Sequence, residues 1–420
     1  MMARLQARQR VAPPPGVRVV VDARPMQEPE RTPLTAEYLE RLLAAFAAEP
    51  IPDESFVIVS RVMRPDPADR LADMGLPVHA RRRLPPTSAL LRSAGLTVDS
   101  FLLRGAELGT AAGAPSEGAV FHTAGGAVPL ASRLPVVATL LDMAPWELPQ
   151  TYAASPAARF GHRLRARVLH DAARVIVCSR ATAESARRRL HLPTDKMAVI
   201  PLAVDDAFRA AGRQVELVER ARERLGIPPR YLCFSGRYDA RKDTRTLFRA
   251  LAAIRSRSPG NGHGAARPSL VIALQPDQPG ERALVAAAVA RSGVADMVTI
   301  IEPRDAAERA AVVAGSEAFV YPCLSEATAL PALEALSVGV PVICSRAGAL
   351  PETVGSSGIV VEPRDPVRMA AALEAIWSGG SLAEQLRRQA HRRAESDTRS
   401  WSDVARETRE VYAQAARELR

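Results

Sequence analysis

Residues Tyr321 to Leu336 read YPCLSEATALPALEAL. The stretch begins at the end of an apolar run and passes into a helical pattern, with Pro331 suited to the first helical turn. A strand that leads directly into a helix is the repeating unit of parallel α/β sheets. We therefore predict a strand, a turn and a helix here, with two carboxylates, Glu326 and Glu334, on either side of the turn.

This turn has the chemistry of a ligand site. The free backbone N–H groups at the start of a helix favour a phosphate, and the carboxylates Glu326 and Glu334 can accept hydrogen bonds from hydroxyl groups. A nucleotide sugar carries both phosphates and hydroxyl groups. Groups that donate hydrogen bonds to phosphate, next to groups that accept them from hydroxyls, would therefore suit it. The structural alternative is that Glu326 caps the helix and Glu334 is an exposed helix residue.

A second segment, residues 234–243, reads FSGRYDARKD and also follows an apolar run. Gly236 permits a tight turn, while Arg237 and Lys242 bring cations to the start of a helix, where a phosphate would bind. Lys242 is one of only two lysines in a chain with 56 Lys and Arg residues, so a compact point charge stands where arginine is the usual choice. The alternative is a solvated turn before an ordinary helix.

Apolar runs rich in Val and Ile alternate with helical stretches along the rest of the chain, which predicts an α/β protein with parallel sheets. A chain of 420 residues exceeds what one core usually serves. The alternation breaks between Pro201 and Pro229 and then restarts. We therefore predict two doubly wound, Rossmann-like domains, residues 1–205 and 206–399, that bind ligand beyond the carboxyl ends of their strands.

The net charge of +10 would suit phosphate-bearing substrates, an anionic membrane face or nucleic acid. The arginines cluster at Arg81 to Arg83, at Arg163 to Arg167 and at Arg187 to Arg189, but aromatic residues are only 4% of the chain. Few aromatics argue against stacking on bases, so we expect no nucleic acid partner. A solvated face is the favoured interpretation of these clusters, with contact to an anionic membrane as the alternative.

The chain shows no apolar run long enough to cross a bilayer, and Pro13 to Pro15 follow its arginine-bearing start in place of a secretion segment. We expect a cytoplasmic protein, with peripheral contact at the inner face of the membrane left open. The four cysteines are far apart and lie in or beside apolar runs, which predicts buried thiols.

Taken together, these segments resemble the retaining glycosyltransferases of GT-B fold in glycosyltransferase family 4, also called glycosyl transferases group 1. The resemblance spans residues Val17 to Ala413. Its most specific parts are Gly236-Arg237 followed by Lys242, the Glu326 and Glu334 pair, and the run from Gly339 to Glu352.

The resemblance implies a metal-independent hexosyltransferase that uses a UDP- or GDP-linked sugar as donor, needs no cofactor, and acts in polysaccharide biosynthesis on a glycan, lipid-linked or small-molecule acceptor. The first domain would bind the acceptor, the second the donor, and the helix at 400–420 would pack back onto the first. The implied donor and catalytic residues are Gly236, Arg237, Lys242, Ile301, Glu302, Glu326, Ala329, Leu330 and Glu334.

Some residues depart from the family pattern. Ala327 and Ala329 replace glycines, and Leu141 replaces a histidine that the family places before Asp142. Asp142 remains as a polar residue for the acceptor side and for catalysis. His122, at the end of the preceding predicted strand, is either a substitute sugar ligand or a structural histidine.

The connection after the first predicted strand also departs from the family, because it lacks the usual glycine loop. Arg24 and Arg31 lie in it and would suit an anionic acceptor, although solvated loop residues are the favoured interpretation. These departures leave two alternatives to a transferase: a catalytically impaired GT-B binding or scaffold protein, and a sugar-nucleotide epimerase.

Overall fold

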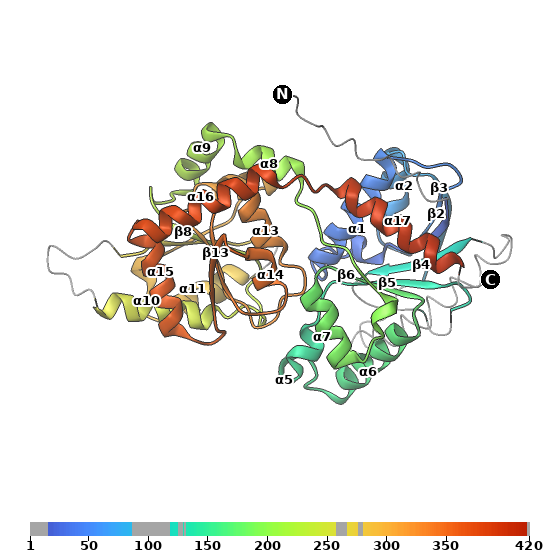
Figure 1. Cartoon of the computed structure of the whole chain (residues 1–420), viewed down its shortest axis with the longest axis horizontal. Coiled ribbons are helices and arrows are strands. Elements are labelled where there is room, and N and C mark those ends of the chain that lie inside the picture. Colours follow the sequence, from blue (N-terminus) through green and yellow to red (C-terminus); the bar gives the residue numbers. More distant parts are fainter. Residues whose placement is uncertain are drawn as a thin grey trace, which may run out of the picture. The chain divides into compact units, whose positions relative to one another are not determined.

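The computed structural model describes residues 16–85, 118–124, 129, 132–257, 267–275 and 280–417. Its strands form two parallel sheets, each covered by helices (Figure 1). This is the α/β class that the alternation of apolar runs and helical patterns predicts. Among the described residues, no helix has both the length and the apolar character needed to cross a bilayer.

The first sheet has seven strands in the order β3-β2-β1-β4-β5-β6-β7. The strands are β1 Arg18–Asp22, β2 Ser55–Arg61, β3 Val78–Leu84, β4 Ala119–Ala124, β5 Val136–Leu140, β6 Arg174–Val177 and β7 Met197–Val199. Six of them lie at apolar runs that predict strands. The edge strand β3 does not, because its sequence VHARRRL contains the Arg81 to Arg83 cluster; it pairs in parallel with β2.

The second sheet has six strands in the order β10-β9-β8-β11-β12-β13. They are β8 Leu232–Ser235, β9 Leu270–Ala273, β10 Val298–Ile301, β11 Phe319–Tyr321, β12 Val342–Ser345 and β13 Gly358–Val361. The central strands β8 and β11 are neighbours, with Cys233 paired to Phe319. The two segments that suggest a nucleotide-sugar site follow these two strands, so the topology brings them to the same edge of the sheet.

Helices follow most of the strands in the described part of the chain. Those of the first half are α1 Pro33–Ala48, α2 Pro67–Asp73, α4 Ala144–Glu147, α5 Pro149–Tyr152, α6 Pro156–Asp171, α7 Arg180–Leu190, α8 Asp206–Gly212 and α9 Val215–Leu225. Those of the second half are α10 Thr244–Arg257, α11 Glu281–Arg291, α12 Ala306–Ala314, α13 Leu330–Ser337, α14 Leu350–Val354, α15 Pro366–Trp377, α16 Ser381–Ser396 and α17 Trp401–Arg417.

The chain divides into two compact units. The first unit comprises residues 1–139, 171–175 and 402–420, and the second comprises residues 140–170 and 176–401. Helix α17 belongs to the first unit, where the Tyr412 hydroxyl bonds Nδ1 of His122 at 2.5 Å and Arg409 forms a buried ion pair with Glu54 at 2.7 Å. The boundary at residue 205 differs from this division and stays a prediction.

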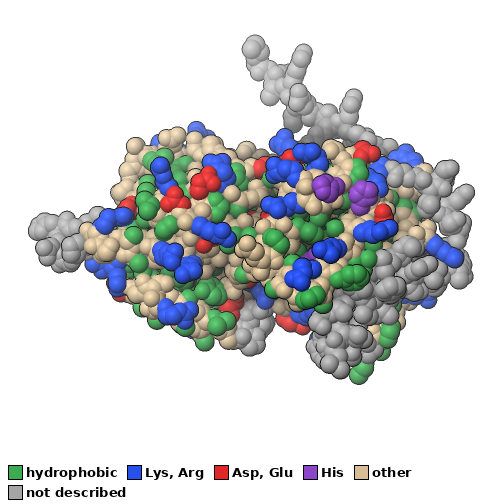
Figure 2. Space-filling model, turned by 90° about the horizontal axis from the view of Figure 1, so that it is seen from below, with side chains coloured by type: hydrophobic (Ala, Val, Ile, Leu, Met, Phe, Trp, Pro, Cys, Tyr) green, Lys and Arg blue, Asp and Glu red, His purple; other side chains and the backbone are tan. Residues whose placement is uncertain are grey.

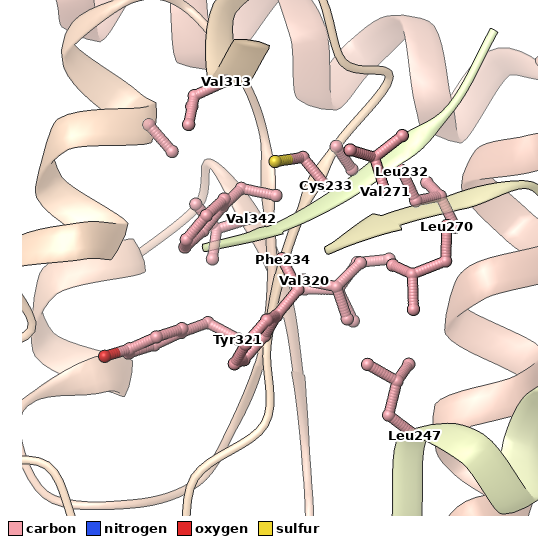
Figure 3. Close-up of a cluster of buried hydrophobic side chains, with 14 of the residues drawn as sticks. Leu232, Cys233, Phe234, Leu247, Leu270, Val271, Val313, Val320, Tyr321 and Val342 are labelled. Carbon is pink, nitrogen blue, oxygen red and sulfur yellow. The ribbon is translucent and has the colours of Figure 1, made fainter. Parts of the chain in front are cut away.

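The second unit has a continuous hydrophobic core around its sheet. Phe234, Val320 and Val342, from three neighbouring strands, are at most 1% exposed. Figure 3 shows Tyr321 at the side of this cluster with its hydroxyl directed away from the aliphatic side chains. The core therefore fixes the ring of Tyr321 and leaves its polar end for the residues that follow β8 and β11.

The positive charge is spread over the described part of the face drawn in Figure 2. On the face drawn in Figure 2, Lys and Arg side chains occur singly and in small groups among hydrophobic and acidic side chains. Several of the clustered arginines have acidic partners, for example Arg81 with Asp69 at 2.6 Å and Arg187 with Glu184 at 2.7 Å. These pairs fit the interpretation of a solvated face for those two clusters.

Candidate active site

Lys242 and Glu326 meet in the interior of the second unit. The ammonium group of Lys242 is 2.9 Å from Oε2 of Glu326, and the two side chains are 4% and 8% exposed. Lys242 also donates to the hydroxyl of Tyr321 and to Sγ of Cys323, and the Tyr321 hydroxyl donates to Glu326 at 3.2 Å. The cation and the carboxylate that the sequence placed 84 residues apart therefore form one buried cluster.

The cluster keeps its charges because each one stabilises the other. Burial alone would raise the pKa of Glu326, but the charge and hydrogen bond of Lys242 outweigh it, and the pKa falls to about 2. Burial alone would lower the pKa of Lys242, but the nearby Cys323 and Glu326 groups raise it well above its usual value. Lys242 is therefore a cation and Glu326 an anion at neutral pH.

Glu326 also organises the turn before α13. Its Oε1 accepts hydrogen bonds from the backbone N–H groups of Thr328 at 3.3 Å and Ala329 at 3.1 Å. Ala329 adopts a left-handed conformation with φ of 53°, which is uncommon for any residue but glycine. The N–H of Ala329, which the family resemblance assigns to phosphate, is thus already bonded, and a phosphate would have to displace Glu326 from it.

A glycine loop supports the backbone of Glu326. Gly348 has φ of 48°, and a Cβ atom there would lie 1.9 Å from the carbonyl oxygen of Glu326. The next residue, Ala349, donates its N–H to this same oxygen at 2.8 Å. The chain between β12 and α14 can therefore approach Glu326 closely only with glycine at position 348.

Gly236 and Arg237 lie at the carboxyl end of β8. Gly236 has φ of 144°, which favours glycine, and Arg237 is half-buried. The following N–H, of Tyr238, donates to Glu281 at 2.5 Å. The structure thus confirms the turn that the glycine predicts, while the contact of Arg237 with a phosphate stays a prediction.

Arg241 is a second cation of the site, and no role for it was predicted from the sequence. It bonds Asp239 at 2.9 Å and lies 3.4 Å from Oδ2 of Asp142, the polar residue retained after β5. Asp142 also accepts the N–H of Ala144 at the start of α4 at 2.9 Å. Asp142 therefore lies beside Arg241, which follows β8 and directly precedes Lys242 in the sequence.

Glu334 has a protein partner that its position one turn inside α13 did not reveal. Both of its carboxylate oxygens accept from Arg309 of α12, at 2.6 and 2.8 Å, and Glu334 is only 6% exposed. It is thus not the exposed helix residue of the structural alternative. To hold ribose hydroxyls, it would have to share its oxygens with this guanidinium.

The remaining predicted donor residues lie at strand and helix ends. Ile301, the last residue of β10, is 3% exposed, and its carbonyl oxygen accepts the N–H of Leu274 at 3.0 Å. Glu302 is exposed and pairs with Arg282 at 3.4 Å. Leu330 is the first residue of α13 and is buried. Their contacts with a nucleotide stay predictions.

His122 lies in the interior of the first unit, where both of its ring nitrogens have partners. Nε2 is 3.0 Å from the hydroxyl of Thr139, and Nδ1 bonds Tyr412 of α17. Burial lowers the pKa of His122 to about 4, although the charge of Asp22 acts in the opposite direction. Of the two interpretations offered by the sequence, these contacts favour the structural histidine over the sugar ligand.

The arginines of the first connection have local acidic partners. Arg24 is buried and makes two bonds to Asp22, at 2.7 and 2.8 Å, and Arg31 pairs with Glu28 at 2.8 Å. A role for either residue in binding an anionic acceptor would compete with these pairs.

The turn between β11 and α13 is further held by α4 and α7, which the sequence did not indicate. Ser325 donates to Glu147 at 2.6 Å, and the same carboxylate accepts from Ser185 at 2.5 Å. Thr182 donates to the carbonyl oxygen of Ala327 at 2.8 Å. These contacts fix the segment that carries Glu326 from both sides.

Comparison with solved structures defines the class of the fold. Sucrose-phosphate synthase from Thermosynechococcus elongatus has a TM-score of 0.67 at 20% identity, with 96% of this chain and 99% of that chain covered. WaaG, a glycosyltransferase involved in lipopolysaccharide biosynthesis, has a TM-score of 0.66 at 13% identity, covering 94% and 99%. The two parallel sheets are those of the GT-B glycosyltransferase fold.

The sequence comparisons give the family. Residues 229–379 match the family described as Glycosyl transferases group 1, and residues 116–208 match the Glycosyltransferase Family 4 description. Through these two regions the chain belongs to the family 4 glycosyltransferases, as its motifs predict.

Two curated relatives illustrate the range of the family. A D-inositol 3-phosphate glycosyltransferase of Salinispora tropica is 28% identical over 60% of this chain and 53% of its own length. An MMP alpha-(1->4)-mannosyltransferase of Mycolicibacterium hassiacum is 36% identical over 35% of each chain. The chain thus spans about half or less of the length of these relatives.

Proposed function

We propose that this protein transfers a sugar from a nucleotide diphosphate sugar to a hydroxyl group of an acceptor, with retention at the anomeric carbon and without a metal ion. The observation that carries the proposal is the buried pair of Lys242 and Glu326 at 2.9 Å, formed where β8 and β11 end. A sugar diphosphate needs a cation for its phosphates and, close by, a group that accepts hydrogen bonds from the sugar hydroxyls.

The proposed division of labour follows the two predicted domains. Residues 206–399 hold the donor: Arg237 and Lys242 bind the diphosphate, Glu326 accepts from hydroxyls of the transferred sugar, and Glu334 accepts from the ribose. Residues 1–205 hold the acceptor. Asp142 lies beside Arg241, 3.4 Å away, so it brings a group from after β5 to the residues that follow β8.

In the reaction we propose, the bond between the anomeric carbon and the β-phosphate oxygen breaks, and a bond from that carbon to the acceptor oxygen forms. The acceptor proton passes to the leaving phosphate. Lys242 and Arg237 stabilise the negative charge that develops on the diphosphate, and they stand in the place that a metal ion takes in other transferases. The loss of the family histidine at Leu141 does not remove any group from this step.

For the donor we propose a UDP- or GDP-linked hexose. HepE of Anabaena, solved in complex with UDP and glucose, shares the fold at a TM-score of 0.62 and 14% identity. For the acceptor we propose a hydroxylated molecule that carries an anionic group, in keeping with the relatives named D-inositol 3-phosphate glycosyltransferases. A role at the inner membrane face in polysaccharide biosynthesis remains part of the proposal.

The test is slow hydrolysis of the donor by the purified chain. Incubated with UDP- and GDP-linked hexoses in turn, the protein should release one nucleoside diphosphate, and EDTA should not prevent it. Lys242→Ala and Arg237→Ala should abolish the release. Unaltered turnover in both variants would contradict the assignment of the site.

One observation supports a second candidate function, that of a GT-B protein that binds a ligand without catalysis. Both site carboxylates already have cationic partners, Lys242 and Arg309, and the Ala329 N–H is bonded to Glu326. A binding protein would be stabilised by a nucleoside diphosphate but would neither hydrolyse the sugar nucleotide nor transfer its sugar. Product formation with a phosphorylated polyol as acceptor decides between the two.

A further inference from the structure

Arg165 of α6 is a buried cation that the site described above does not use. The residue is 8% exposed, and its buried Nε has no hydrogen-bond partner among the described residues. The guanidinium lies over the ring of Trp146, with 5.0 Å from its central carbon to the ring centroid. Burial lowers the pKa of Arg165, partly offset by the charge of Asp142. A buried guanidinium without a hydrogen-bonded anion is costly.

A second unsatisfied group lies next to the first. His162, one turn earlier on the same face of α6, bonds the carbonyl oxygen of Tyr152 through Nε2 at 3.1 Å, so that nitrogen carries the proton. Its other nitrogen, Nδ1, is buried without a partner in the described chain. The rings of His162 and Trp146 are 6.1 Å apart, so Trp146 contacts both groups.

Arg241, which is closer to the Lys242 cluster, is less suited than Arg165 to bind an added anion. Arg241 is held between Asp142 and Asp239, at 3.4 and 2.9 Å. Asp142 also has an electrostatic interaction with Arg165. Arg241 thus connects the Lys242 cluster to Asp142, and Asp142 in turn acts on Arg165. Among the described residues, Arg165 has no hydrogen-bonded carboxylate.

We propose that Arg165 and His162 form a subsite for a phosphate monoester on the acceptor. The guanidinium would donate to the phosphate oxygens, and Nδ1 of His162 would meet an acid proton of the phosphate or a neighbouring hydroxyl. Asp142 would then face the acceptor between its phosphate and the donor. This inference rests on the proposed function and names the class of acceptor for it.

Inorganic phosphate is the first probe, used on the full-length chain. At constant ionic strength, millimolar phosphate should raise the melting temperature of the wild type, because a ligand of the folded state stabilises it. The Arg165→Gln variant should need at least roughly tenfold more phosphate for the same rise in melting temperature, because a charged hydrogen bond is lost. Arg163→Gln, an exposed arginine of the same helix, is the matched control and should respond like the wild type.

Lys242→Ala separates this subsite from the donor site. Phosphate bound at Arg165 should still stabilise the Lys242→Ala variant, whereas phosphate bound at the donor site should not. An equal response of Arg165→Gln and Arg163→Gln, or loss of the response in Lys242→Ala alone, would overturn the proposal.

The stability of the protein without ligand gives an independent measurement. Arg165→Met keeps most of the volume and removes the charge, so its melting temperature without phosphate should equal or exceed that of the wild type. A lower melting temperature would show that the guanidinium is a structural partner of Trp146 and would count against the subsite.

The source of the phosphate is tested with D-inositol 3-phosphate and unphosphorylated inositol. The phosphorylated molecule should stabilise the wild type at lower concentration than inorganic phosphate, and inositol should have no effect. Equal effects of the phosphorylated molecule and free phosphate would contradict an acceptor subsite. Donor hydrolysis is measured separately, so a protein that binds phosphate at Arg165 but hydrolyses no donor would refute the proposed function alone.

Discussion

Lys242 shows why residue type matters in an arginine-rich chain. Its compact ammonium group meets three partners, Tyr321, Cys323 and Glu326, and its charge also lies 4.0 Å from the centre of the Tyr321 ring. Three donors that radiate from one atom satisfy this arrangement, and a planar guanidinium would not fit it. The rarity of lysine in the sequence was therefore a useful signal for this position.

Removal of Lys242 should cost stability as well as activity. Lys242→Ala leaves Glu326 buried without its cation, which we expect to lower the free energy of unfolding by about 3–5 kcal/mol. Urea unfolding followed by circular dichroism measures this. The double variant Lys242→Met with Glu326→Gln should regain most of the stability but no donor hydrolysis; if it stays as unstable as Lys242→Ala, the ion pair is not the cause.

Glu326 also predicts a pH dependence. Its pKa is about 2 in the folded protein against 4.5 as the ordinary value, so the folded state binds its proton less tightly than the unfolded state. The resulting stabilisation is complete above pH 4.5 and is lost as the pH falls from 4.5 towards 2. In Glu326→Gln, the melting temperature should fall less steeply over this range. Identical slopes in both proteins would contradict the lowered pKa.

Ala329 stores backbone strain where the family has glycine. With φ of 53°, the alanine costs about 1 kcal/mol relative to an ordinary conformation. Ala329→Gly should therefore raise the melting temperature. Ala327→Gly is the matched control: position 327 does not have positive φ, so glycine there should lower stability through the greater freedom of the unfolded chain. A lower melting temperature for Ala329→Gly would show that its buried methyl group matters more than the strain.

At the scale of elements, the site depends on how closely two loops approach. Gly348→Ala would place a Cβ 1.9 Å from the Glu326 carbonyl oxygen and must push the two loops apart. We expect a loss of donor hydrolysis together with a loss of stability of at least about 2 kcal/mol. Gly380→Ala is the control, since its nearest contact would be 3.9 Å and its φ is ordinary. Equal activity in the two variants would refute the supporting role of Gly348.

The elements that sequence patterns identified are those with strong apolar runs. β8 to β13 lie at apolar runs of the sequence, because buried parallel strands are rich in Val, Ile, Leu and Phe. β3 was missed because an edge strand tolerates arginines on its exposed side, and α16 was missed because most of its residues are polar. Pairing with β2 stabilises β3, and packing on α13 stabilises α16. Neither contact can be recognised from the sequence of the element itself.

The candidate site shows the same limit. The family resemblance grouped Lys242, Glu326 and Glu334, and the structure places Lys242 and Glu326 in contact. The partners Tyr321 and Arg309 were not assigned roles, because a hydrogen bond between side chains depends on rotamers and on neighbouring helices. A residue such as Arg309 becomes informative only when α12 is seen beside α13.

At the scale of the whole molecule, the two compact units should respond differently to ligand. The proposed donor residues all lie in the second unit, which has its own core. In calorimetry, the nucleoside diphosphate that the protein binds should raise the unfolding transition of the second unit more than that of the first. Lys242→Ala should remove this effect. Equal shifts of all transitions would show that the units unfold together or that the ligand contacts both.

The route of the chain between the units has a consequence for biosynthesis. The polypeptide leaves the first unit, returns to it for residues 171–175, and returns again at residue 402 with α17. His122 and Glu54 are made early, yet their partners Tyr412 and Arg409 emerge from the ribosome 290 and 355 residues later. The nascent first unit must therefore wait, with these polar groups unmatched, while the second is translated, and chaperone engagement is expected to be greatest in that interval.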